Sequence, residues 1–349
     1  MKTIKDIAEL AGVSPATVSK VINGYSDISE ATRNRVMKIV RRENFQPNPI
    51  ASGLSGKSSR SIGIFLHCNP SRGIHHAFMH QILFTLRSRL GEYGYDCVIF
   101  SDLWLHKGSN FLHICQNRRV DGAVLLGVDK SEPGIAALLS SDLPSVFIDS
   151  NVEGKHAVDV IWDHYGGGRK VADYLYELGH YKIGLIKGYP STEPTKGRTA
   201  GFLDGLRSHG LEINPQWIFE GDFLEETGYN GMGFLLKQER IPTAVFCQSD
   251  SIAVGAMQAA EELGFSCPED ISIIGYDDIE VCRYMRPRLT TIRQDTAAMG
   301  ETVADILLDL MNHGKTQENY RLLPVDLITR ESCRRLEEEV LWAKKCQRS

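Results

Sequence analysis

The chain has 349 residues, enough for two or three domains, and its 42% hydrophobic and 24% charged residues are ordinary for a soluble globular protein. The net charge of −5 is unevenly spread, because residues 1–60 hold 10 Lys and Arg against 5 Asp and Glu, a balance of +5 that leaves −10 for the rest. A basic segment on an acidic body suggests a polyanionic partner for the first sixty residues and none for the remainder, although on charge alone a chance local excess explains the balance equally well.

The eight cysteines are scattered singly, with no CxxC pair, which argues against a zinc site and for reduced thiols. The first residues lack the long apolar run of a signal peptide, and no segment approaches the length of a membrane span. We therefore expect a cytoplasmic protein.

The first predicted elements are three short helices. Thr3 and Asp6 form a capping-box pattern that opens the first helix. A glycine turn separates it from the second helix, which Ser14 is expected to cap, and Ser29 is expected to cap the third. Three short helices with a tight turn between the first two predict a helix-turn-helix.

The second helix has an apolar stripe of Val18, Val21 and Ile22. The residues off this stripe are short donors and one cation, namely Ala16, Thr17, Ser19, Lys20 and Asn23. Such groups suit the phosphate oxygens and base edges of a DNA major groove. A small helical module that binds protein would show a similar polar face, so it is the added basic charge that favours DNA.

Residues 4–36 read IKDIAELAGVSPATVSKVINGYSDISEATRNRV, and this stretch resembles the DNA-binding headpiece of the lactose-repressor/galactose-repressor (LacI/GalR) family of bacterial transcription regulators. The resemblance implies that residues 15, 16 and 20 read bases, with Lys20 donating to guanine, while some specificity comes from DNA shape. The DNA-contacting residues expected from it are Thr3, Ser14, Pro15, Ala16, Thr17, Ser19, Lys20, Asn23, Ala51 and Leu54.

Residues 51–58 read ASGLSGKS and match the phosphate-loop pattern GxxxxGK[ST], except that Ala51 replaces the first glycine. A phosphate loop follows a strand and opens a helix, whereas a predicted helix precedes this stretch and a predicted strand follows it. The family resemblance instead places a hinge helix at 49–55, with Leu54 as a wedge between base pairs in the minor groove. We expect this short segment to fold only on DNA, and Ser52 replaces an arginine frequent there.

After residue 60, short apolar runs alternate with helical segments. The predicted strands are 61–66, 96–100, 122–128, 145–149, 157–162, 182–188, 243–248 and 271–278. Helices are expected between most of them, at 78–92, 167–178, 196–209 and 252–263. Near-continuous apolar strands separated by helices indicate parallel sheets in doubly wound α/β lobes, and the number of strands favours two lobes.

The resemblance continues to about residue 332 and implies a two-lobed core of the periplasmic-binding-protein type, joined by three crossovers. Lobe one is expected from 61–161 plus 292–320, and lobe two from 162–291 plus 321–332. The full set of expected domains is a headpiece at 1–46, a hinge helix and linker at 47–60, the effector-binding core at 61–332 and a tail at 333–349.

Ligands of such folds bind beyond the carboxyl ends of the strands. Asp149 and Asp277 end predicted strands, where a carboxylate can accept from two adjacent hydroxyls, and Arg198 offers a planar donor fork. Trp162 and Phe223 offer flat faces for a sugar ring. The alternative readings place Asp277 and its neighbour Asp278 in a loop, Arg198 in an ion pair with a neighbouring acid, and Trp162 in the core. The family resemblance favours Arg198 and Asp277 most strongly as effector contacts.

Four further positions bear on the predicted effector cleft: two are expected at its edge, and two differ from the residues that the family usually has there. His76 and Phe78 are expected at its rim. Ser249 stands where many family members have Asn, and Thr296 stands where some place an aromatic ring against the ligand. The cleft is therefore recognisable, but its specificity does not carry over from the family.

Catalytic motifs such as GxSxG, GxGxxG and HExxH are absent from the sequence. The run Gly166–Gly168 is expected to be a flexible turn rather than an anion site. The cluster of His75, His76 and His80 lacks a third ligand at a suitable spacing, so neither a metal nor a cofactor is expected. A cytosolic sugar-binding protein or an enzyme of the same fold is the alternative, but neither explains the first sixty residues.

We expect the whole chain to be a DNA-binding transcriptional regulator, and a repressor is the favoured kind. Its operator affinity would be controlled by a small-molecule effector, a sugar or sugar derivative, bound between the lobes. The resemblance implies that two chains pair through their cores and present two headpieces to a pseudo-palindromic operator. Residues 333–349 hold fewer than two clean heptads, so a homodimer is favoured over a tetramer.

Overall fold

The computed structural model describes residues 2–22, 25, 27–45, 58–66, 77–100, 110–128, 130–314 and 318–336. The chain divides into two compact units, Met1–Arg60 and Ser61–Ser349. Within the described residues, no helix is both long enough and apolar enough to cross a membrane.

The first unit contains α1 (Ile4–Ala11), α2 (Pro15–Ile22) and α3 (Glu30–Arg42), as expected for a helix-turn-helix. The predicted capping box is present, because the backbone N–H of Thr3 donates to Asp6 and the N–H of Asp6 donates back to Thr3. Gly12 ends α1 with φ of 61°, a left-handed conformation that favours glycine. The three helices share a small core of Ile7, Ala8, Ala11, Val18, Val21 and Val36.

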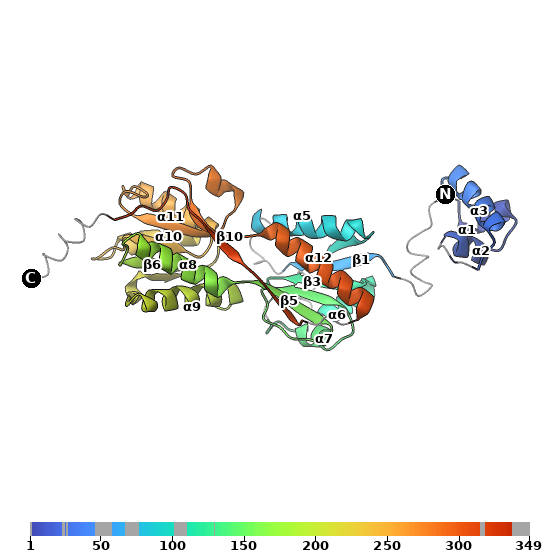
Figure 1. Ribbon diagram of the computed structural model, residues 1–349, viewed down its shortest axis with the longest axis horizontal. Coiled ribbons are helices and arrows are strands. Elements are labelled where there is room, and N and C mark those ends of the chain that lie inside the picture. Colours follow the sequence, from blue (N-terminus) through green and yellow to red (C-terminus); the bar gives the residue numbers. More distant parts are fainter. Residues whose placement is uncertain are drawn as a thin grey trace, which may run out of the picture. The chain divides into compact units, whose positions relative to one another are not determined.

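The first lobe of the second unit is built on a sheet of six parallel strands in the order β11-β5-β4-β3-β1-β2. These strands are β1 (Ser61–Leu66), β2 (Asp96–Phe100), β3 (Gly122–Leu126), β4 (Ser145–Ile148), β5 (Ala157–Trp162) and β11 (Tyr320–Leu323). The helices are α5 (Ala77–Glu92), α6 (Phe111–Arg118), α7 (Ile135–Leu139) and α12 (Thr296–His313). Figure 1 shows α12 lying along α5, although more than 200 residues separate them in the chain.

The second lobe has a sheet in the order β12-β10-β9-β8-β6-β7, parallel except for the antiparallel pair β10–β12. Its strands are β6 (Ile183–Lys187), β7 (Ile218–Glu220), β8 (Ala244–Cys247), β9 (Ser272–Asp277), β10 (Thr290–Gln294) and β12 (Val325–Ile328). The helices are α8 (His164–Glu177), α9 (Glu193–Ser208), α10 (Glu225–Leu236) and α11 (Asp250–Glu262), with short 3-10 turns at Pro215–Trp217 and Glu280–Arg283. Helices α8 and α9 pack as one pair, and α10 and α11 as another.

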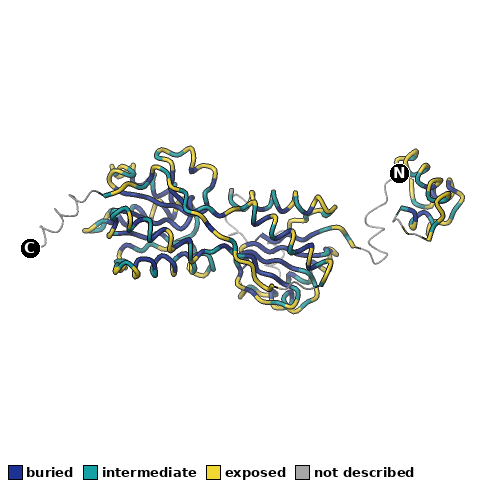
Figure 2. The backbone as a smooth tube through the Cα atoms, in the orientation of Figure 1, coloured by how far each residue is buried: buried dark blue, intermediate teal, exposed yellow. Residues whose placement is uncertain are grey.

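The central strands of both sheets are buried on both faces, which explains their near-continuous apolar sequences. Figure 2 shows this burial along the strands and the more exposed outer sides of the helices. The doubly wound α/β architecture expected from the sequence is thus confirmed.

The chain passes between the lobes at three places: after β5, after β10 and after β11. Two of these crossovers end in an aspartate that caps the next helix, since Asp163 accepts from Gly166 N–H at 2.7 Å and Asp295 accepts from Ala298 N–H at 2.9 Å. The third crossover is Pro324, between β11 and β12.

The strand pairing corrects the expected lobe boundaries by a few residues. Trp162 belongs to β5 of lobe one, β10 carries lobe two on to Gln294, and β11 extends lobe one to Leu323. The expected changes at 161/162, 291/292 and 320/321 were therefore slightly early. Apolar patterning reveals a strand but not the sheet whose edge it joins, and for β11 the parallel pairing with β5 decides this.

The run Gly166–Gly168 lies inside α8, so the expected flexible turn was wrong. A Cβ on Gly168 would lie 2.2 Å from the backbone oxygen of Arg198 in α9, and one on Gly201 would lie 1.9 Å from the backbone oxygen of Tyr165. The two helices are thus in backbone contact, which only glycine permits. These glycines set how deeply Arg198 sits in lobe two.

Candidate functional site

The headpiece presents the face that the sequence predicted for DNA. Pro15, Ala16 and Lys20 are exposed on α2, whereas Val18 and Val21 on its other side are buried. Thr17 and Ser19 are half-buried, and Thr3 and Ser14 are exposed. Three predicted DNA contacts, Asn23, Ala51 and Leu54, lie outside the described residues.

Two polar contacts organise this face. The hydroxyl of Ser14 accepts from the backbone N–H of Thr17 at 3.1 Å, which confirms Ser14 as the cap of α2. The ammonium of Lys20 lies 2.5 Å from a carboxylate oxygen of Asp27, and the two side chains are 47% and 53% exposed. An ion pair this exposed contributes little to stability because solvent screens it, so a nucleic acid can displace it. Sequence reasoning overlooked Asp27.

In the core, Arg198 of α9 is the centre of a buried polar network. One terminal nitrogen of its guanidinium donates to the backbone oxygen of Gln248, and the other donates to the side-chain oxygen of Gln294 at 3.3 Å. The carboxylate of Asp277 lies 3.5 Å away, with both side chains only 5% exposed. The guanidinium carbon stands 3.7 Å from the centre of the Tyr276 ring, a cation–π distance.

Asp277 and Gln294 end neighbouring strands, β9 and β10. The amide nitrogen of Gln294 donates to Asp277 at 2.7 Å, so Gln294 contacts both members of the ion pair between Arg198 and Asp277. Asp277 has φ of 121°, a strained conformation for a residue with a side chain. Strain of this kind gathers at ligand sites, where the surroundings hold it in place.

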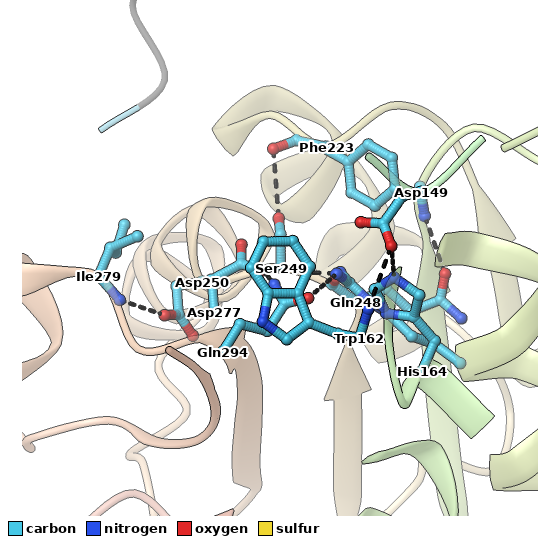
Figure 3. A network of polar contacts seen from close by, with 12 residues as sticks. Asp149, Trp162, His164, Phe223, Gln248, Ser249, Asp250, Asp277, Ile279 and Gln294 are labelled. Atoms are coloured by element: carbon cyan, nitrogen blue, oxygen red, sulfur yellow. Dashed lines mark hydrogen bonds and ion pairs between the residues drawn. The ribbon is translucent and has the colours of Figure 1, made fainter. Parts of the chain in front are cut away.

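Asp149 follows β4 and also has a positive φ, of 56°. Its carboxylate accepts from the ring nitrogen Nε2 of His164 at 2.9 Å and from the backbone N–H of Trp162 at 3.3 Å. Figure 3 shows Asp149 and His164 joined on one side of the Trp162 indole, with Asp277 and Gln294 on the other. The indole is 1% exposed, and its ring centre lies 5.2 Å from that of Phe78 in a tilted contact, so Trp162 is a buried wall of this region.

Ser249 caps α11, because its hydroxyl accepts from Ile252 N–H at 3.1 Å. The same hydroxyl donates to the backbone oxygen of Phe223 at 3.2 Å, which fixes the loop that carries that ring. Asp250 instead turns inward and accepts from Ile279 N–H at 2.9 Å. Burial, followed by the nearby charge of Asp277, raises the pKa of Asp250 well above its ordinary value.

The network therefore brings together most of the predicted effector residues: Asp149, Trp162, Arg198, Phe223, Ser249 and Asp277, with Phe78 against Trp162. His76 lies outside the described residues. Sequence reasoning missed His164, Gln248 and Gln294, although the two glutamines follow or end strands, where ligand-binding groups gather. Among the described residues, no group of three His, Cys, Asp or Glu side chains is placed to hold a metal ion.

Comparison with known proteins decides the family. Residues 3–48 match the family model described as bacterial regulatory proteins, lacI family, and residues 172–333 match that of a periplasmic binding protein-like domain. An HTH-type transcriptional repressor PurR of Actinobacillus pleuropneumoniae serotype 3 (strain JL03) is 33% identical, over 96% of this chain and 99% of that protein. The chain belongs to the lacI family.

Other relatives of this lacI-family chain agree. The repressor PurR of Escherichia coli O139:H28 (strain E24377A / ETEC) is 35% identical over 95% of this chain and 97% of its own length. The structure of the lac repressor dimer bound to operator and the anti-inducer ONPF superposes with a TM-score of 0.83, at 31% identity over 95% of this chain and 99% of that one. The transcriptional regulator CelR–cellobiose complex gives a TM-score of 0.72 at 28% identity, over 95% and 100%. This lacI-family chain is thus a DNA-binding transcriptional regulator, as the sequence predicted.

Proposed function

We propose that this regulator is a repressor whose operator affinity is set by a sugar or sugar derivative bound between the two lobes. The observation that carries the proposal is the buried cluster of Arg198, Asp277 and Gln294, which lies at strand ends beside a crossover. Ligands of open α/β sheets bind at such strand ends. Two solved relatives hold sugars, cellobiose in one and ribose in another, which supports the same class here.

The chemistry of the cluster suits a polyol. The carboxylates of Asp149 and Asp277 accept from hydroxyls, and the guanidinium of Arg198 donates to ring and hydroxyl oxygens. Phe223, whose ring centre is 5.8 Å from the guanidinium carbon, and Trp162 provide flat apolar surfaces. Most donors of Arg198 already have protein acceptors, so an effector must exchange with these bonds and thereby disturb the network.

The test is calorimetric titration of the full-length chain with ribose, cellobiose, further pentoses and hexoses, sugar phosphates and free nucleobases. We expect saturable binding by one sugar or sugar derivative. Saturable binding by nucleobases alone would show the effector class to be wrong. In parallel, DNA fragments selected by the full-length chain from a random pool are expected to share two inverted half-sites. A pool with no shared sequence would contradict operator recognition.

We also propose that two chains pair through their cores and place their headpieces in successive major grooves of a pseudo-palindromic operator. Apolar side chains exposed on the surface of the core support this pairing, because they offer area that a second chain can bury. They are Phe84 and Tyr93 at α5, Val98 and Ile99 on the edge strand β2, and Val281 and Tyr284 in lobe two. Within each headpiece, Pro15, Ala16 and Lys20 would meet base edges, and Leu54 would wedge into the minor groove.

A further inference from the structure

His164 occupies an unusual place between the two lobes. It is the first residue of α8, directly after the crossover from β5, and only 5% of it is exposed. Both of its ring nitrogens have partners: Nε2 lies 2.9 Å from the carboxylate of Asp149, and Nδ1 lies 3.4 Å from Nε of Arg198. Since Asp149 directly follows a strand of lobe one and Arg198 belongs to a helix of lobe two, this imidazole bridges the lobes.

The partners of His164 determine where its proton lies. A guanidinium N–H can only donate, so Nδ1 of His164 must accept from Arg198. The single ring proton is then on Nε2, which donates to Asp149. A proton on Nδ1 would face the N–H of Arg198 and break this link. The geometry thus requires a neutral imidazole in one tautomer.

The bridge extends beyond Arg198. The same guanidinium contacts Gln294 and Asp277, and Gln294 is the last residue of β10 before the chain crosses back into lobe one. A continuous chain of polar contacts therefore starts at the end of β4 in lobe one and returns to a second crossover. Such connected networks carry coupling when they have two discrete arrangements.

We propose that His164 is a positioning residue that couples the two lobes. Its imidazole links Arg198 to Asp149, so that a change at either residue alters the position of the other. This inference rests on the proposed effector site and adds a mechanism to it. An effector hydroxyl that donates to Asp149 competes with Nε2 of His164 for the carboxylate. When the imidazole turns away from Asp149, Nε of Arg198 loses its hydrogen-bond acceptor, and the guanidinium group reorients in lobe two.

The competing explanation is that His164 merely fills space. Its ring centre is 6.4 Å from that of Trp162 and 6.2 Å from that of Tyr276, so it does pack among aromatic rings. A residue needed only for packing would be replaceable by phenylalanine without loss of communication between Asp149 and Arg198. A coupling residue would not, whereas glutamine, which has one donor and one acceptor, would restore part of the link.

The first test is ¹⁵N–¹H correlation spectroscopy of the imidazole in the ligand-free full-length protein, with the signal assigned by its loss in His164→Gln. We expect a neutral ring protonated on Nε2 alone. A ring protonated on Nδ1, or on both nitrogens, would overturn the proposal.

The second test follows the Nε–H signal of Arg198, assigned by its loss in Arg198→Lys. Asp149→Asn should shift this signal in the native background, while the matched control Asp142→Asn, at an exposed site of lobe one, should not. The Asp149→Asn shift should vanish in His164→Phe and partly return in His164→Gln. An equal shift in His164→Phe, or none in the native background, contradicts coupling through the imidazole. Neither test uses an effector, so the outcome is independent of which ligand class calorimetry finds.

Discussion

At the scale of single residues, the proposed effector site depends on charges that are almost wholly removed from water. The side chains of Arg198 and Asp277 are each 5% exposed. Removing one member of a buried ion pair leaves the other charge uncompensated, which costs about 3–5 kcal/mol. An alanine at either position would therefore test stability as much as ligand binding. A substitution that keeps the charge separates the two effects.

Arg198→Lys retains the positive charge but loses the planar fork that reaches Gln248 and Gln294 together. We expect effector affinity to fall at least tenfold, about 1.4 kcal/mol, with operator affinity in the absence of effector changed less than threefold. Calorimetry with the identified effector and fluorescence anisotropy with the selected DNA measure the two quantities. The matched control is Arg207→Lys on the exposed side of the same helix, which should change neither. Unaltered effector affinity in Arg198→Lys would show that Arg198 does not bind the effector.

His180 carries a pH dependence of stability that is separate from the cleft. It is fully buried, with its ring nitrogens 3.0 Å from the hydroxyl of Thr243 and 3.0 Å from the backbone oxygen of Arg334. Burial lowers its pKa from 6.5 to about 4. Below pH 6.5 the unfolded chain takes up a proton at this position that the folded chain refuses until about pH 4.

The stability that His180 contributes is therefore complete above pH 6.5 and is lost as the pH falls towards 4, by about 3 kcal/mol in all. Urea unfolding of the native chain and of His180→Gln between pH 7 and 4.5 measures this loss. The glutamine variant keeps a hydrogen-bonding side chain but does not titrate, so its stability should fall less steeply with acid. Equal pH slopes for the two proteins would show that His180 is not the titrating group.

At the scale of elements, the helices of lobe two pack in pairs whose backbones touch. A Cβ on Gly228 of α10 would lie 1.8 Å from the backbone oxygen of Ile252, and one on Gly255 of α11 would lie 1.8 Å from that of Glu225. No rotamer change can relieve contacts with backbone atoms. The two glycines together set the spacing of α10 and α11, as the glycines of α8 and α9 do for the helix that carries Arg198.

Gly255→Ala should destabilise the core by about 2 kcal/mol or more, because the new methyl group overlaps the backbone of α10. The matched control is Gly233→Ala in α10 itself, where no atom lies within 4 Å of the added Cβ. That change should be neutral or stabilise the helix by up to about 1 kcal/mol. Thermal unfolding followed by circular dichroism measures both. Similar melting temperatures for the two variants would mean that the helices can separate without cost.

The sequence predicted some elements closely and left others out for a physical reason. The bounds of β1, β2 and β5 agree with the expected strands, since each is a distinct run between turn signals. The short strands β7, β10, β11 and β12 were not predicted, because what makes them strands is pairing with distant partners. The proposed effector site was likewise predicted only in part. Strand ends in the sequence indicated Asp149 and Asp277, whereas the link through His164 depends on how α8 packs against α9, which the sequence pattern does not reveal.

At the scale of the whole molecule, charge is divided between the two units. Residues 1–60 carry +5 and the remainder −10, so attraction to DNA is confined to the headpiece. The acidic core repels the phosphates and discourages non-specific contacts away from the headpiece. Binding to DNA should therefore be dominated by the release of counterions around the headpiece contacts.

We expect operator affinity to fall by about a thousandfold between 50 and 200 mM salt, as for proteins with six or more phosphate contacts. Fluorescence anisotropy with the selected DNA at a series of KCl concentrations gives the slope. Lys20→Gln should lower the affinity at every salt concentration, while Glu9→Gln, an acidic side chain exposed on α1, should not. A flat salt response would contradict phosphate-driven binding.

The three crossovers also bear on how the protein is made. The first unit is one continuous stretch, so its three helices can fold once residue 60 has left the ribosome. Neither lobe can close its sheet until the last strands have been added, β11 at Tyr320–Leu323 and β12 at Val325–Ile328. A chain interrupted before residue 320 therefore contains a folded headpiece and an incomplete effector-binding core. The late strands make a complete effector-binding core depend on nearly complete synthesis.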